Sequence, residues 1–138
     1  MHTELTLYNR LYNKLDAILN LEELLKHNIE YNIKLKSEGY MDLSVEILEK
    51  TPEYVRISLT HYGEQNGDLM ADPDMEVKIY PKQQLAESLT FQNDYLGVYQ
   101  VVYPESNKVN LTLKKELNQF LSQWLSNLKS QGFKKIPK

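Results

Sequence analysis

The residues best suited to chemistry lie between His61 and Glu76, where acidic side chains recur at short spacing. Four carboxylates fall within eleven residues, at Glu64, Asp68, Asp72 and Asp74. Carboxylate oxygens are the ligands that Mg²⁺ and Ca²⁺ prefer. A negatively charged segment also suits a basic partner. The segment therefore points to one of two functions, binding a divalent cation or binding another protein.

A purely structural interpretation of the same segment stays open. Asn66-Gly67 favours a tight turn with positive φ, and Asp72-Pro73-Asp74 favours a second turn. Leu69 and Met70 would then pack into the core and hold down a loop that spans residues 63–74. Loops of this length are uncommon in compact domains unless they serve a function.

Two metal-binding spacings fail here. Glu64, Asn66 and Asp68 alternate as in an EF-hand loop, but Gly67 stands at the fourth position instead of the sixth. His61 and Glu64 have the spacing of two ligands on one helix face, yet on a strand they point to opposite sides. We therefore expect no resident cofactor, with a divalent cation on this loop as the alternative.

The chain is rich in tyrosine, with ten in 138 residues. Tyr54 and Tyr62 share the parity of the polar residues of their strand, and Tyr80 does so beside Lys78. Such rings would lie on the open side of a sheet, where tyrosine is frequent at protein interfaces. They would also suit a homodimer. The alternative is that tyrosine simply fits a half-exposed strand.

Composition excludes several classes of function. The chain has no cysteine, so it has no disulfides, thiolate zinc sites or cysteine nucleophiles. The net charge of −3 makes nucleic acid a poor partner, and we expect Lys134, Lys135 and Lys138 to form a solvated tail. No apolar run approaches the roughly 20 residues that cross a bilayer, and the N-terminus lacks a secretory pattern. We expect a cytoplasmic protein with no membrane partner.

Periodicity predicts the elements that position these residues. Apolar residues at helical spacing predict two helices near the N-terminus, at 4–19 and at 21–27, and the second follows a capping box from Asn20 to Glu23. The same spacing predicts a C-terminal helix at 113–128, with Gly132 as its cap. Period-two alternation predicts strands at 40–47, 55–60, 75–80, 85–91 and 97–103. We expect Trp124 to be a core anchor.

These elements predict one α+β domain over residues 1–138. N-terminal helices precede an antiparallel meander of about five strands, and the C-terminal helix packs on one sheet face.

Two stretches resemble bacterial families. Met75-Glu-Val-Lys-Ile-Tyr80, together with Leu117-Asn-Gln-Phe-Leu-Ser-Gln-Trp-Leu125 and Gly132, resembles the YqiB-like family of gammaproteobacterial proteins of unknown function. The stretch from His61 to Glu76 is similar to a domain of unknown function carried on bacterial plasmids and mobile elements. These resemblances imply a bacterial protein and bring no activity with them. The second leaves open a role in interference with host defence.

The sequence favours a non-enzymatic module that binds a protein or regulates one. It contains no GxSxG, P-loop, GxGxxG or HExxH signature. The candidate binding residues are His61, Tyr62, Glu64, Asn66, Asp68, Asp72, Asp74 and Tyr80. The alternative is a metal-dependent enzyme or small-ligand binder that uses the acidic loop at 61–76.

Overall fold

The computed structural model describes residues 2–133, and the side chains of residues 5–133. The described residues form three helices: α1 (His2–Leu19), α2 (Leu21–Leu24) and α3 (Leu111–Ser130). The predicted lysine tail lies outside the described residues.

The ends of the helices follow their local chemistry. Helix α3 begins at Asn110, whose Oδ1 accepts a hydrogen bond from the Leu113 amide at 3.0 Å, and it ends before Gly132 at φ +86°. The predicted capping box at Asn20 is wrong, because Asn20 adopts a left-handed conformation and its side chain makes no capping bond. Instead, Asp16 Oδ1 accepts from the Leu21 amide at 2.9 Å, and α2 ends at Leu24, earlier than expected.

Among the described residues, seven strands form one antiparallel sheet. Six of them follow the order β1-β2-β3-β4-β6-β7, and the seventh, β5, pairs with the C-terminal end of β4. Their bounds are β1 (Asn32–Leu35), β2 (Leu43–Lys50), β3 (Val55–Gln65), β4 (Asp68–Tyr80), β5 (Leu85–Ser88), β6 (Thr90–Asn93) and β7 (Val98–Val101).

The predicted count of about five strands is too low, for two local reasons. Strand β1 has only four residues, too few to display a period. The predicted strand at 85–91 is interrupted at Leu89, so that β5 and β6 pair with different parts of β4. The antiparallel meander and the α+β class are confirmed.

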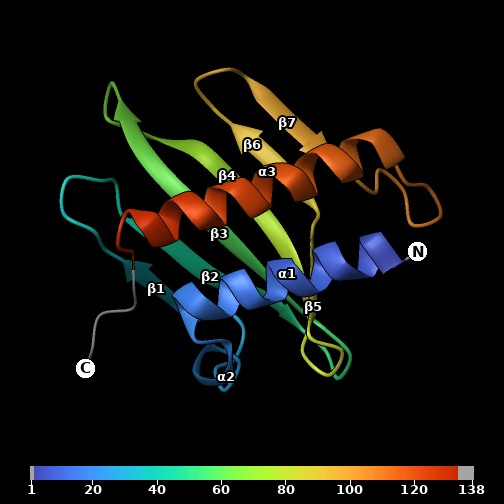
Figure 1. Cartoon of the computed structure of the whole chain (residues 1–138). Coiled ribbons are helices and arrows are strands. Elements are labelled where there is room, and N and C mark those ends of the chain that lie inside the picture. The colour runs from blue at the N-terminus through green and yellow to red at the C-terminus, as the bar shows by residue number, and fades with distance from the viewer. Residues whose placement is uncertain (1, 134–138) are drawn as a thin grey trace.

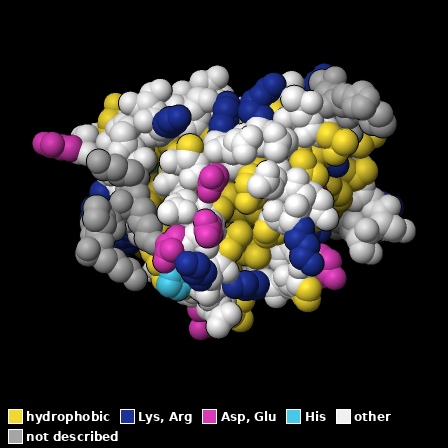
Figure 2. Space-filling model, turned by 60° about the horizontal axis from the view of Figure 1, so that its bottom comes forward, with side chains coloured by type: hydrophobic (Ala, Val, Ile, Leu, Met, Phe, Trp, Pro, Cys, Tyr) yellow, Lys and Arg dark blue, Asp and Glu magenta, His cyan; other side chains and the backbone are white. Residues whose placement is uncertain are grey.

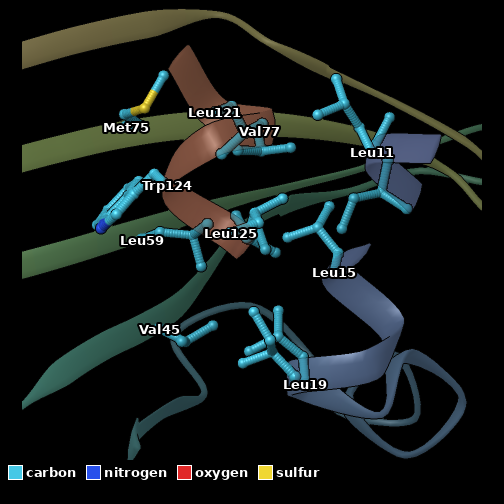
Figure 3. Packing of buried hydrophobic residues seen from close by; sticks show 14 of the residues in the cluster. Leu11, Leu15, Leu19, Val45, Leu59, Met75, Val77, Leu121, Trp124 and Leu125 are labelled. Carbon is cyan, nitrogen blue, oxygen red and sulfur yellow. The ribbon is translucent and has the colours of Figure 1, made fainter. Parts of the chain in front are cut away.

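Helices α1 and α3 lie side by side across one face of the sheet and leave the other face open (Figure 1). The core lies between the helical layer and the sheet, and both contribute buried side chains to it. Figure 3 shows Leu15 of α1 and Leu125 of α3 pointing toward strand residues such as Leu59. Trp124 is 8% exposed within this cluster, as predicted. The alternation of buried and wetter residues along β2, β3 and β4 therefore reflects one covered and one open face.

A buried polar link ties α3 to the sheet. The Ser88 amide donates to Asn118 Oδ1 at 2.7 Å, and Ser88 Oγ donates to the Leu117 carbonyl at 3.2 Å. Asn118 is 1% exposed and Ser88 is fully buried, so the Asn118 oxygen satisfies a strand amide that water cannot reach. The link sets the position of α3 along β5.

Candidate binding surface

The segment from His61 to Glu76 is the outer half of the β3–β4 hairpin and not a loop. Strand β3 continues to Gln65 and β4 begins at Asp68, so only Asn66 and Gly67 form the turn, with φ values of 52° and 84°. The predicted Asn66-Gly67 turn is confirmed, since both residues favour positive φ. The predicted second turn at Asp72-Pro73-Asp74 is wrong, because these residues lie within β4 beside an irregularity in the pairing.

The four carboxylates from Glu64 to Asp74 lie in different environments. Asp74 accepts from Thr60 Oγ1 at 3.0 Å, and Asp72 accepts from Asn93 Nδ2 at 2.9 Å. Glu64 and Asp68 are exposed near the tip of the hairpin. Among the described residues, no three His, Asp or Glu side chains are placed to hold a metal ion together.

His61 belongs to the core. It is 8% exposed, and its ring lies 5.6 Å from the rings of both Trp124 and Phe133. Its Nδ1 is 3.0 Å from the carbonyl oxygen of Asp42. The ring therefore lies on the helix-covered side, while the neighbouring Tyr62 is 44% exposed.

The ends of two hairpins together carry large exposed apolar side chains. The β6–β7 turn is held against β4 because the Asp94 amide donates to the Ala71 carbonyl at 2.9 Å, and the Ala71 amide donates to Asp94 Oδ2 at 2.7 Å. On this pair of hairpins Leu69 is 69% exposed and Leu96 is 72% exposed. We define the hairpin-end surface as the exposed side chains at these two tips, which lie on both faces of the β3–β4 hairpin: Tyr62, Glu64, Asp68, Leu69, Tyr95 and Leu96. The expectation that Leu69 packs into the core is wrong, because the hairpin extends past the helices that would cover it.

Charge is distributed unevenly between this surface and the rest of the chain. Residues 57–77 and 83–107 include both hairpin ends, and they contain eight of the nineteen acidic residues and none of the sixteen basic ones. Burial raises the pKa of Asp74, and the nearby charges of Glu76, Asp94 and Glu46 raise it further against the lowering effect of the Thr60 hydrogen bond. These like charges are thus close enough to Asp74 to affect its protonation.

A second feature, a tyrosine–carboxylate cluster, lies on the open face of the sheet. Glu87 is 8% exposed, and its carboxylate accepts from Tyr80 at 3.0 Å and from Tyr103 at 2.6 Å. A hollow of about 450 Å³ lies beside it, lined also by Tyr54, Arg56 and other residues. The parity of Tyr80 correctly predicted its place on this face. Glu87 was missed, although it stands in a predicted strand between two buried residues, Ala86 and Ser88.

Charges in the hollow are largely paired. Arg56 donates to Glu49 at 3.2 Å and to Glu76 at 2.5 Å, and the Lys78 ammonium lies 4.1 Å from the centre of the Tyr54 ring. Burial and the Glu87 carboxylate raise the pKa of Tyr80 and of Tyr103 well above the ordinary value of about 10. Both phenols are therefore hydrogen-bond donors at neutral pH. We interpret the cluster as a hydrogen-bond network that stabilises the open face of the sheet.

Residues 13–134 match a protein family described as Domain of unknown function (DUF6908). The chain belongs to this family. The match begins within α1 and includes both hairpins, the cluster around Glu87 and helix α3. No curated protein and no solved structure matches the chain.

The family match supports the expectation of an uncharacterised domain. The resemblances to the YqiB-like family and to a mobile-element domain stay predictions, as does bacterial origin. None of the helices among residues 2–133 has the length and apolar character needed to span a bilayer.

Gly63 of the DUF6908 domain makes room for the Tyr95 ring on the hairpin-end surface. A Cβ at position 63 would collide with the Tyr95 hydroxyl and would lie 3.2 Å from Cζ of the ring. Gly63→Ala should therefore displace the Tyr95 ring while the hairpin stays folded, because the backbone at Gly63 does not have a positive φ. Nuclear Overhauser contacts between position 63 and the ring should be lost in the variant.

The double variant Gly63→Ala/Tyr95→Phe provides the control. It removes the hydroxyl that collides, so a small shift of the ring should restore contact with position 63. Absence of these contacts in the wild type would show that the ring does not pack on Gly63 in solution.

Proposed function

We propose that this DUF6908 chain is a non-enzymatic protein-binding module that uses the hairpin-end surface to bind a partner with a basic, partly apolar surface. One observation carries the proposal. Leu69 and Leu96 are 69% and 72% exposed, and they lie at the ends of two hairpins, within residues 57–77 and 83–107, which contain carboxylates but no lysine or arginine.

The composition of the surface resembles that of protein interfaces. Interfaces combine a centre of aromatic and aliphatic side chains with a polar rim. Here Tyr62 and Tyr95 supply rigid aromatic area, at 44% and 45% exposure, and Glu64 and Asp68 supply an acidic rim. The apolar centre would provide most of the affinity, because charged rims chiefly steer association and choose the partner.

A cytoplasmic location and a bacterial host are part of this proposal. The similarity of residues 61–76 to a mobile-element domain would make the partner a host protein, as in interference with host defence. The alternative of a metal or ligand site built from His61, Glu64, Asp68 and Asp72 has less support, because His61 lies in the core and Asp72 bonds Asn93.

The double variant Leu69→Ser/Leu96→Ser tests the proposal by affinity capture. Wild-type protein is immobilised, proteins of the source cell are captured, and the strongest specific partner is purified and titrated by calorimetry. The double variant should weaken its binding by at least tenfold, since burial of two leucine side chains contributes about 1.5–3 kcal/mol each. Binding should also weaken as salt rises, because the acidic rim attracts a basic surface.

Leu111→Ser is the matched control. Leu111 is 70% exposed at the start of α3, far from the hairpin ends, so its replacement removes the same kind of side chain from another surface. It should leave the affinity within twofold of wild type. Equal affinity of the double variant and wild type would refute the proposal.

A further inference from the structure

A second surface, independent of the hairpin ends, lies on the helical layer. A groove of about 540 Å³ runs between α1 and α3. The residues lining it are Thr6, Asn9, Arg10, Asn13, Lys14 and Ala17 of α1, and Leu125, Ser126 and Lys129 of α3. Three of them are cations and none is a carboxylate. In Figure 2, Lys and Arg side chains gather along the upper edge with no Asp or Glu side chain among them.

Lys14 is a partly buried ammonium without an acidic partner. Its Nζ donates to Ser122 Oγ and Ser126 Oγ at 2.8 Å each and to the Ser122 carbonyl at 3.0 Å. These acceptors satisfy its hydrogen bonds but do not neutralise its charge, and no described carboxylate lies within ion-pair distance of it.

A second cation adds to this uncompensated charge. Burial lowers the pKa of Lys14, and the positive charge of Arg10 lowers it further. Arg10 is exposed one helical turn away, and it too forms no ion pair with a described carboxylate. Two like charges side by side repel each other, and an anion placed between them removes that repulsion.

The groove holds both polar and apolar contacts. Asn13 and Ser126 offer further hydrogen-bonding groups beside the cations, while Ala17 and Leu125 line the groove with apolar atoms. A volume of about 540 Å³ is in the range of small-molecule sites. A phosphate group carries up to two negative charges and three acceptor oxygens, which suits three clustered cations better than a single carboxylate does.

We propose that the groove between α1 and α3 is a binding site for a small organic molecule that carries a phosphate group. Arg10 and Lys129 would bind the phosphate, Lys14 would add its positive charge while it keeps its hydrogen bonds to Ser122 and Ser126, and Ala17 would contact the organic part. The site lies on the helical layer, so it would be occupied independently of a partner on the hairpin ends.

Inorganic pyrophosphate is the probe, titrated into the full chain at constant ionic strength and followed by amide NMR. The shifts should be confined to residues 6–17 and 122–129. Arg10→Gln and Lys14→Met should each raise the Kd at least tenfold. Lys115→Gln, which removes an exposed cation from α3 outside the groove, should change the Kd less than twofold.

Thermal melts keep the test independent of folding. Lys14→Met should melt somewhat below wild type without pyrophosphate, because the loss of three hydrogen bonds from α1 to α3 outweighs the removal of a partly buried charge that has no counter-ion. If Lys14→Met does unfold, the Kd of Arg10→Gln decides the test, because Arg10 is exposed and its replacement should not affect folding. Pyrophosphate should raise the Tm of wild type and of Lys115→Gln, and not that of Arg10→Gln.

Three results would overturn the proposal. One is a set of shifts that spreads over all lysine-bearing segments and weakens equally in Lys115→Gln. Another is citrate binding as tightly as pyrophosphate, which would assign the groove to carboxylates. The third is light scattering that shows a dimer of wild type and a monomer of Lys14→Met, which would place the acidic hairpin of a second copy in the groove.

Discussion

Replacing Trp124 by alanine is expected to lower the free energy of unfolding by about 3–5 kcal/mol, the range for removing a large buried aromatic side chain. Trp124 is 8% exposed, and its ring lies between α3 and the sheet near Leu59 and Met75 (Figure 3). It also meets the His61 ring edge-on at a centroid distance of 5.6 Å. Its loss would therefore leave a cavity where the helical layer meets β3.

Urea unfolding followed by circular dichroism measures this loss, since the variant has no tryptophan to report fluorescence. A domain of this size has a total stability of about 5–15 kcal/mol, so the variant should be close to unfolding at 37 °C. Leu111→Ala on the same helix is the control. Because Leu111 is 70% exposed, the change should stay within about 0.5 kcal/mol. A loss below about 1 kcal/mol for Trp124→Ala would mean that α3 does not pack on the sheet as described.

Glu87→Gln is expected to lower the free energy of unfolding by about 1.5–3 kcal/mol, the worth of a hydrogen bond to a charged group. In the wild type, both phenols donate to one buried carboxylate, at 3.0 Å from Tyr80 and 2.6 Å from Tyr103. A glutamine keeps one acceptor oxygen but turns an NH₂ group toward the second phenol. One of the two tyrosines could then only accept from this NH₂ group, and its own O–H would lose its acceptor.

The same variant should change the pH dependence of stability. In the wild type, the folded-state pKa of both phenols is raised above the unfolded value of about 10. The unfolded chain therefore releases these protons first, so stability is full below about pH 10 and falls as pH rises above it. Glu87→Gln removes the negative charge and lowers both folded-state pKa values, so its stability should fall less steeply between about pH 10 and 12.

Spectrophotometric titration of the tyrosines, with urea midpoints at pH 7 and pH 11, checks both parts. In wild type, Tyr80 and Tyr103 should titrate above the ordinary phenol pKa of about 10. Glu105→Gln is the control, because the ion pair of Glu105 with Lys108 is largely solvent-exposed. Unchanged tyrosine titration in Glu87→Gln would contradict the hydrogen bonds described here.

Some features of the fold could be predicted because they depend on burial with a fixed period. Leu15 and Leu125 lie in helical stripes, and Val45 and Leu59 lie in alternating runs, and all four are buried as expected. One side of each element contacts the core and the other contacts water, so the pattern appears in the sequence. The same logic placed Tyr80 on the open face.

The prediction failed where an element leaves the core. Residues 62–74 extend beyond the helices, so neither face needs to be apolar and no alternation marks the strands. The sequence of this segment is therefore typical of a long loop. It also predicts that Leu69 packs into the core, although Leu69 is 69% exposed.

The sequence by itself determined the two amphipathic helices, the antiparallel pairing and the two-residue turn at Asn66-Gly67, because each depends on local periodicity or on local backbone preference. Only the tertiary structure decided which distant residues meet: Glu87 with Tyr103, Tyr95 with Gly63, and Lys14 with Ser126. Such contacts join elements far apart in the chain, and no local pattern records them. Both surfaces proposed for binding depend on contacts of this kind.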